Sequence, residues 1–452
     1  MLGRIHRAKL NILDPQLQPM NFRFINPSEK SRICQAINAD QEFRLASRLF
    51  SKDILLMVGE IQCLIKIRDG AVVEIKHHPT FMNPWSFFLK GSADGWEKFL
   101  RPIPPPTYTD LYGAIARQHF ELGGDIETAF AHFWALTRML EIFREFENGT
   151  LPAAEAAMPE PCAGEIELVV GKYIYLNIHG VGYRVYYEEC GSGIPLICQH
   201  TAASDGRLWR HLLNDAAITE KFRVIVPDLP YHGKSLPPQS VEWWKQEYKL
   251  TKNFFIDFHV ELPRALRLDR PVFMGCSMGG QLAVELAIER PKEFRAVIGL
   301  ESGLSRARMA PTLDFHDHPR ISNEFRMQSM YGKTAPGNPE YYRREIAWSY
   351  GQSAPPVAKG DLYYNFIDHN LTGGEASQID TSRIAVYLMT GEYDWGNSPD
   401  QTRILAEQIK GSKFIEMKGL GHFPMAENFL RFKTYLMPVL NEIAASAPTP
   451  NR

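Results

Sequence analysis

The sequence predicts two domains: a smaller α+β domain, followed by an α/β domain whose mostly parallel sheet is covered by helices on both faces. Three observations lead to this prediction. The 452 residues are too many for one ordinary domain. A stretch rich in Ala, Pro and Glu, residues 149–164, has the composition of a linker. After it, short apolar segments alternate with helical lengths, as in parallel sheets.

The linker sets the expected boundaries at residues 1–148 for the first domain and 165–446 for the second. The first domain is expected to open with an irregular segment of about 40 residues. Apolar and β-branched segments then predict four strands, at residues 54–58, 61–67, 71–76 and 86–89. A helix is expected to begin at Ser92 or Asp94. A second, starting at Asp125, has apolar residues every three or four positions.

The segments around these helices carry a family resemblance. Residues 88–92 (FLKGS), 96–100 and 122–125 (LGGD), the last ahead of an aromatic helix, are similar to the sterol-carrier-protein domain. In that family a small sheet and its helices enclose an apolar tunnel for lipid-like ligands. The resemblance, over about residues 45–145, implies that the first domain holds a hydrophobic ligand. The alternative is that the aromatic residues are ordinary core.

The second domain begins with a predicted antiparallel hairpin, residues 165–178 and 183–188. Six short apolar segments follow as expected strands, at residues 195–198, 222–226, 271–274, 296–300, 384–390 and 413–417. Between the fourth and fifth of these lies a long stretch rich in Tyr, His, Arg and Pro, which exceeds the length of a simple connection. We expect this insertion, about residues 302–380, to form a cap.

The strongest functional motif is Gly-Cys-Ser-Met-Gly at residues 275–279. A predicted strand runs directly into it, and a good helix follows. A nucleophilic serine held in such a sharp turn needs this context, because only glycines leave room around the strained residue. We therefore predict that Ser277 is a nucleophile.

A serine nucleophile needs a base, and the base needs an orienting carboxylate. Asp394 and His422 each follow a predicted strand, at the edge where parallel sheets place their sites. With Ser277, Asp394 and His422 in this order, residues 165–445 resemble the α/β-hydrolase family, and the resemblance implies that these three form its catalytic triad. Glu392 is a local competitor to Asp394. Glu301 stands where some family members carry the acid instead.

The resemblance also implies an oxyanion hole of two backbone N–H groups. Met278 supplies one by its position. Where the family often has a His-Gly pair, this chain reads His200-Thr201-Ala202, and we expect Ala202 to supply the second. His200 and Thr201 are expected to contact substrate, as are Trp395 and Phe423, which follow the acid and the base.

Two further sets of polar residues are not expected to be catalytic. Asp228 and His232, in the family-like segment 227–235, are interpreted as fixing the loop beside the site. The cap also offers polar residues for a substrate: His316, His318, Arg320 and Arg326.

A serine in the elbow disfavours the family's dehalogenases and epoxide hydrolases, which use aspartate there. The expected reaction is hydrolysis of a carboxylic ester or lactone of a hydrophobic small molecule through an acyl-enzyme. The elbow is also similar to that of carbon–carbon bond hydrolases acting on ring-fission products or β-diketones. Acyl transfer, cofactor-free peroxidase chemistry and a non-catalytic lipid carrier stay open.

Composition limits the partners. The formal charge of -2 gives no electrostatic case for binding nucleic acid or an anionic membrane. Residues 1–11 lack the apolar run of a signal peptide, and no apolar stretch is long enough for stable membrane insertion, so a cytoplasmic protein is expected. The six cysteines are scattered and suggest neither a disulfide framework nor a metal site, and we expect no cofactor or metal. A homo-oligomer is left open.

Overall fold

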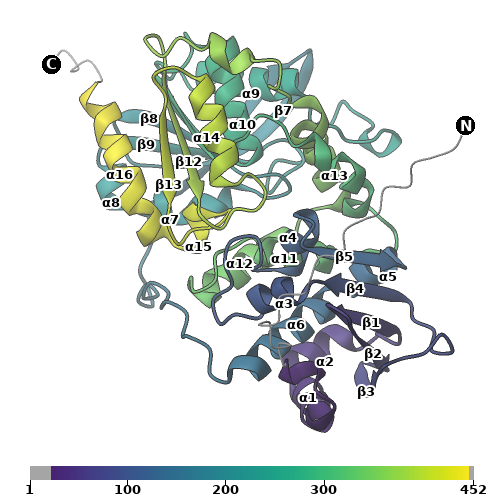
Figure 1. Ribbon diagram of the computed structural model, residues 1–452. Helices are drawn as coiled ribbons and strands as arrows, with labels where there is room; N and C mark the ends of the chain where they lie inside the picture. Colours follow the sequence, from purple (N-terminus) through teal and green to yellow (C-terminus); the bar gives the residue numbers. More distant parts are fainter. Residues whose placement is uncertain (1–21, 447–452) are drawn as a thin grey trace, which may run out of the picture.

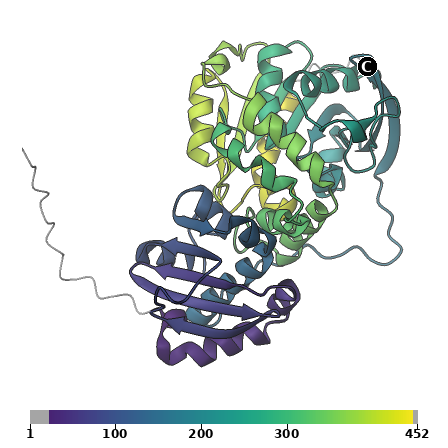
Figure 2. The ribbon, with the colours of Figure 1, turned by 90° about the vertical axis from the view of Figure 1, so that its right-hand side faces the viewer.

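The protein is described here from a computed structural model, which covers residues 22–446. The expectation that residues 1–11 form no signal peptide concerns residues outside this range. Two bodies lie one above the other, each with its own sheet (Figures 1 and 2). They are joined by an extended connection, and the chain forms no helix or strand between Asn148 and Val170. The expected linker falls within it.

The first sheet has five strands in the order β3-β2-β1-β4-β5. Its members are β1 Asp53–Val58, β2 Ile61–Arg68, β3 Ala71–His77, β4 Phe87–Gly91 and β5 Phe120–Gly124. Strands β1 and β4 pair in parallel and the other neighbours are antiparallel. The first four lie where the sequence predicts them, and β5 was not predicted.

Six helices accompany this sheet. They are α1 Lys30–Ala39, α2 Gln41–Ser47, α3 Ala93–Phe99, α4 Leu111–Ala116, α5 Ile126–Ala131 and α6 Phe133–Asn148. Ser92 caps α3 as predicted, accepting a hydrogen bond from the Gly95 N–H. Two expectations were wrong: the opening is helical over α1 and α2, and the helix predicted from Asp125 is broken at His132 into α5 and α6.

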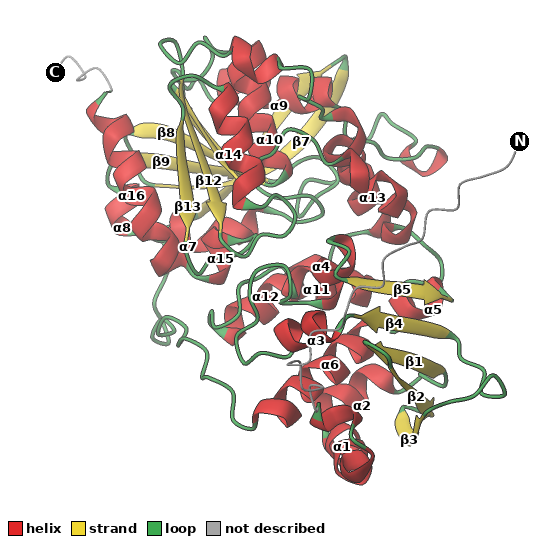
Figure 3. Cartoon of the chain, in the orientation of Figure 1, coloured by secondary structure: helices red, strands yellow, loops and turns green. Residues whose placement is uncertain are grey.

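The second sheet has eight strands in the order β13-β12-β11-β10-β8-β9-β7-β6. Its strands lie among the helices of the upper body (Figure 3). They are β6 Val170–Ile178, β7 Val181–Cys190, β8 Ile194–Gln199, β9 Phe222–Pro227, β10 Val272–Cys276, β11 Ala296–Leu300, β12 Ala385–Gly391 and β13 Lys413–Met417. The hairpin β6–β7 and the pair β7–β9 are antiparallel, and the pairs from β9 through β13 are parallel. The predicted mostly parallel sheet is confirmed.

Helices cover both faces of this sheet. They are α7 Arg210–Leu213, α8 Ala216–Thr219, α9 Lys252–Ala265, α10 Met278–Glu289, α14 Pro399–Gln408, α15 Pro424–Glu427 and α16 Phe429–Ala445. Successive residues of a central strand enter different cores: Val272 and Met274 belong to one, and Phe273 between them to the other. Both faces of the sheet are therefore buried, which explains why its strands read as continuous apolar runs.

The cap lies between β11 and β12 and contains α11 Asn323–Tyr331, α12 Glu340–Gly351 and α13 Pro355–Tyr363. Its helices α11 and α12 lie between the two sheets (Figure 1). Phe325 of α11 and Trp395 of the second domain share one hydrophobic core with the first domain. Among the described residues, no helix has the length and apolarity needed to cross a membrane.

Candidate active site

The turn from β10 into α10 holds Ser277 in a strained backbone conformation, with φ 59° and ψ -112°. Its N–H donates to the Leu300 carbonyl at 3.0 Å. The neighbouring glycines are required by space: a Cβ at Gly275 would lie 2.4 Å from the Gly279 carbonyl oxygen, and one at Gly280 2.0 Å from that of Leu300. The serine is therefore presented at the carboxyl edge of the sheet by a turn that tolerates few other sequences.

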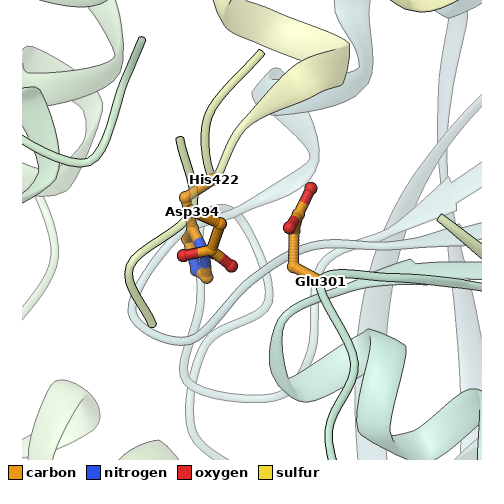
Figure 4. Close-up of side chains that lie close together, drawn as sticks. All are labelled: Glu301, Asp394 and His422. Atoms are coloured by element: carbon orange, nitrogen blue, oxygen red, sulfur yellow. The ribbon is translucent and has the colours of Figure 1, made fainter. Parts of the chain in front are cut away.

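His422 and Asp394 meet at the same edge, in the loops after β13 and β12 (Figure 4). The His422 Nδ1 lies 2.9 Å from the Asp394 Oδ2, although the ring N–H is not directed along that line. Asp394 also accepts backbone hydrogen bonds from Gly396 at 2.7 Å and Asn397 at 3.2 Å. Glu392, the local competitor, instead accepts from the Gly419 N–H. The geometry therefore pairs His422 with Asp394.

The charge states of this pair follow from burial and from its neighbours. Burial opposes ionisation of Asp394, but the close contact with His422, together with Glu301 and Lys333, holds its pKa below the usual range. Burial lowers the pKa of His422, the Asp394 charge opposes this, and Lys333 adds to the lowering. At neutral pH the arrangement is thus an ionised carboxylate beside a neutral imidazole.

Glu301 is a second buried acid beside this pair (Figure 4). It follows β11 with φ 56°, and its two carboxyl oxygens accept from the Gly391 N–H at 2.9 and 3.2 Å. Burial, and next the charge of Asp394, raise the pKa of Glu301 well above normal, which favours its neutral form. Glu301 therefore does not compete for His422 as a second charge.

Glu301, Asp394 and His422 could also be considered as metal ligands, because their ligand atoms all lie within 4.8 Å of one another. A bound metal needs deprotonated, available ligands. Here one acid is neutral, and the oxygens of both acids already accept backbone hydrogen bonds. The contacts fit an acid–base pair better than a metal site.

A cavity opens over Ser277 and His422. Three other predicted site residues line it: Thr201, Ala202 and Trp395. Asp394 does not reach the cavity, because it lies behind His422 in contact with the ring. The remaining lining comes mostly from the cap, with one residue from the first domain: Tyr112, Ala203, Arg306, Met309, His316, Arg326, Met330, Lys333, Tyr350, Leu362 and Phe366.

Two predicted substrate contacts are corrected by the structure. His200 is fully buried outside the cavity lining: its Nδ1 is paired with the Thr201 carbonyl at 2.9 Å, and its Nε2 accepts from the Leu229 N–H at 3.2 Å. Phe423 is also buried away from the cavity, packed edge-on to His422 and Tyr350. Both side chains support the loops that carry the site.

The segment holding Asp228 and His232 lies outside the cavity lining. The two Asp228 oxygens accept from the N–H groups of Gly206 and Lys234, at 2.9 and 2.8 Å. The His232 Nε2 pairs with the Asp361 carboxylate at 2.8 Å, and Asp361 also accepts from the Ala203 N–H at 2.7 Å. These contacts fix the loop at residues 200–206 against the cap.

The expected oxyanion donors differ in their surroundings. Met278 is the first residue of α10, so its N–H belongs to the group that a helix leaves without an internal partner. Ala202 lines the cavity, and within residues 22–446 its N–H has no hydrogen-bond partner. The glycine of the family's His-Gly pair is absent from this loop. Ala203 instead takes a positive φ of 57°, and its N–H donates to the Asp361 carboxylate.

The polar cap residues separate into two pairs. His316 and Arg326 line the cavity, whereas His318 and Arg320 approach Glu127 of the first domain at 3.8 and 3.1 Å. The sequence reasoning missed Tyr112, Arg306, Lys333 and Tyr350 as cavity residues. No local motif marks them, because their positions depend on how the cap and the first domain pack.

With this geometry in place, comparison with known proteins shows the class. The family described as alpha/beta hydrolase fold matches residues 194–429, more than half of the chain. The chain therefore belongs to the α/β-hydrolase fold family.

Individual relatives are more distant. Haloalkane dehalogenase 2 of Mycobacterium tuberculosis is 28% identical over 115 residues, which cover 25% of this chain and 37% of that protein. The pimeloyl-(acyl-carrier protein) methyl ester esterase of Legionella pneumophila is 30% identical over 119 residues, 26% of this chain and 42% of the esterase. The 2-hydroxymuconate semialdehyde hydrolase of Pseudomonas sp. CF600 is 26% identical over 27% of this chain and 41% of its own. The chain thus matches less than half the length of each.

Solved structures agree on the fold. An esterase from Thermogutta terrifontis superposes with a TM-score of 0.52 at 18% identity, covering 60% of this chain and 99% of its own. The enol-lactonase from Burkholderia xenovorans LB400 gives 0.50 at 20% identity, over 59% of this chain and all of its own.

Proposed function

We propose that the chain is a serine hydrolase that cleaves a carboxylic ester or lactone of a small molecule through an acyl-enzyme. The observation that carries the proposal is the meeting of three groups at one sheet edge. Ser277 in its strained turn and a neutral His422 share a cavity, and an ionised Asp394 lies 2.9 Å behind the histidine. Two relatives named above, an esterase and an enol-lactonase, support this reaction class.

In the proposed mechanism His422 accepts the Ser277 proton as the serine oxygen attacks the carbonyl carbon. The negative charge that forms on the carbonyl oxygen is stabilised by the N–H groups of Met278 and Ala202. His422 then protonates the departing alcohol and activates a water that releases the acid. Asp394 stabilises the imidazolium in both steps, after a small ring rotation that aligns the Nδ1–H with its Oδ2.

Labelling by a fluorophosphonate tests the nucleophile directly. Wild-type protein should be labelled, Ser277→Ala should not, and His422→Ala should react far more slowly. Ser204→Ala is the matched control, because Ser204 is also a buried serine near the site and its hydroxyl has no partner among the described residues. Wild-type protein that stays unlabelled, or a label that survives in Ser277→Ala, would count against the proposal.

Carbon–carbon bond hydrolysis is the second candidate, because such substrates need extra polar groups in the pocket. His316 and Arg326 supply two in the cavity, and the Pseudomonas relative carries the name of a semialdehyde hydrolase. Ser277 speaks against dehalogenase chemistry, since dehalogenases of this family use aspartate at that position. Turnover of p-nitrophenyl esters without turnover of a vinylogous diketone supports the ester reaction, and the reverse result supports the second candidate.

For the first domain we propose a covering role, with the sterol-carrier resemblance kept as the alternative. Tyr112 of this domain lines the cavity, and buried Trp96, Phe99 and Phe120 pack on one another in its hydrophobic core. A fluorescent fatty acid distinguishes the roles when the cavity is first blocked by the fluorophosphonate. If the blocked protein still binds the fatty acid, a lipid tunnel in the first domain is supported. If the blocked protein no longer binds it, the covering role is supported.

A further inference from the structure

Among the described residues, two basic side chains in the cavity have no ion-pair partner in direct contact. Arg306 is 3% exposed and Lys333 8% exposed, and both line the cavity together with Ser277 and His422. Within the described residues neither side chain donates a hydrogen bond or lies within 4 Å of a carboxylate. Each contacts an aromatic ring instead, Arg306 over Phe366 at 5.1 Å and Lys333 over Trp395 at 5.0 Å.

Buried charges without a partner are costly, and proteins nearly always pair them. The third basic residue of the cavity illustrates the usual solution: Arg326 donates to the carbonyls of His316 and Ser353 at 3.0 and 3.3 Å. The two carboxylates that interact electrostatically with these groups are not in direct contact with them. Asp394 pairs with His422 and accepts from two backbone N–H groups. Asp110 accepts from the Gly113 N–H at 2.8 Å through one oxygen, its other oxygen has no hydrogen-bond partner among the described residues, and burial raises its pKa to about 7, which weakens it as a counter-charge.

Lys333 is also held in place by the site itself. The backbone carbonyl of Lys333 accepts a hydrogen bond from the backbone N–H of His422 at 3.0 Å. The backbone of Lys333 is therefore fixed beside the loop that carries the base. Burial, and next the charge of Arg306, lower the pKa of Lys333 to about 7. An anion bound next to both groups would relieve this repulsion and restore the charged ammonium.

We propose that the substrate of this hydrolase carries an anionic group, most simply a carboxylate, that binds to Arg306 and Lys333. The inference rests on the proposed function, since it places the anion in the cavity over Ser277. The apolar remainder of the substrate packs on Met309, Met330 and Leu362. The substrate class is therefore an ester or lactone with an ionised carboxylate on a short apolar body, rather than a neutral hydrophobic ester.

A matched pair of esters tests the proposal: mono(4-nitrophenyl) adipate, which is an anion, and its methyl ester, which is neutral. We expect wild-type protein to favour the anion in kcat/KM. In Arg306→Met and in Lys333→Met the ratio of anionic to neutral kcat/KM should fall about 10- to 100-fold, as for loss of a charged hydrogen bond. Arg308→Met is the control, because Arg308 is a neighbouring but exposed arginine and the ratio should not change.

Fluorophosphonate labelling of each variant shows that its site is folded. The proposal is overturned if wild-type protein has the higher kcat/KM for the neutral ester. It is also overturned if variants that are still labelled lose activity equally on both esters.

A binding measurement separates this proposal from the proposed function. Ser277→Ala protein, titrated calorimetrically with adipate and with dimethyl adipate, should bind only the dianion, and adding Arg306→Met should weaken that binding at least 10-fold. If adipate binds but the wild-type protein hydrolyses no ester, the anion site is supported and the proposed hydrolase function is rejected. Ester hydrolysis without adipate binding rejects the anion site alone.

Discussion

The two buried acids beside His422 can be distinguished by replacing each with its amide. Asp394→Asn and Glu301→Gln both exchange a carboxyl for an amide of nearly equal size, at positions that are 1% and 0% exposed. Only the first is expected to remove a charge, because the pKa of Asp394 is held low, which favours its ionised form, whereas the pKa of Glu301 is raised, which favours its neutral form. The pair therefore tests which acid stabilises the histidine and whether the assigned charge states are right.

The expected magnitude follows from the contact between Asp394 and His422. When His422 takes the serine proton, two opposite charges about 4 Å apart in an effective dielectric of about 20 attract each other by about 4 kcal/mol, close to 10³ in rate. We expect kcat/KM to fall about 10³-fold in Asp394→Asn. In Glu301→Gln it should fall less than about 10-fold, since the change removes no charge and the amide N–H₂ can donate to Asp394 as the neutral carboxyl does.

Initial rates with a p-nitrophenyl ester at pH 8 measure both effects, and circular dichroism of each variant checks that it is folded. The reasoning is refuted if Glu301→Gln loses as much activity as Asp394→Asn. It is equally refuted if Asp394→Asn stays within about 10-fold of wild type, since a charge at this distance cannot be worth so little in a buried site.

Three further predictions concern the base, the elbow and the domain contact. Burial lowers the pKa of His422 from 6.5, so kcat/KM should decline only below pH 6.5; Lys333→Met removes a cation that lowers this pKa and should shift the acid limb of the pH–rate profile upward. Gly280→Ala places a Cβ 2.0 Å from the Leu300 carbonyl oxygen, and it should lower the free energy of unfolding, measured in urea, by more than about 2 kcal/mol. Gly182→Ala, which has open space around its Cβ, should change this free energy little. Arg117→Ala removes hydrogen bonds to the Trp395 carbonyl and to the Gln401 side chain, and it should lower the free energy of unfolding by about 1–3 kcal/mol. Arg101→Ala removes only an exposed ion pair and should lower it by less than about 1 kcal/mol.

The second domain was predictable because its signals are local. Strands buried on both faces read as apolar runs, and the elbow around Ser277 needs glycines that no other residue can replace. Asp394 and His422 could be placed because each follows such a strand directly. That all three meet in space follows from the parallel order of β10, β12 and β13.

The first domain was harder because tertiary contacts override its local signals. Strand β5 contains two adjacent glycines, which disfavour a strand in isolation. A Cβ at Gly123 would lie 2.4 Å from the Phe88 ring, so this glycine serves the packing of β5 on β4. The break between α5 and α6 at His132 has no Gly or Pro to mark it; there the ring stacks on Phe50 at 4.1 Å.

The contact between the domains bears on how the first domain acts. Its α4 packs closely on the second: a Cβ at Gly113 would lie 2.8 Å from the Trp395 ring, and one at Gly332 2.6 Å from the Asp110 Cβ. Tyr112 stands edge-on to Trp395 and to Phe325 of the cap, at 5.3 and 5.5 Å. Moving the domain aside would expose these three rings to water, at about 1.5–3 kcal/mol for each large side chain. A carrier that swings away to load its ligand would incur that cost in every cycle, whereas a fixed cover keeps the rings buried and Tyr112 in the cavity wall.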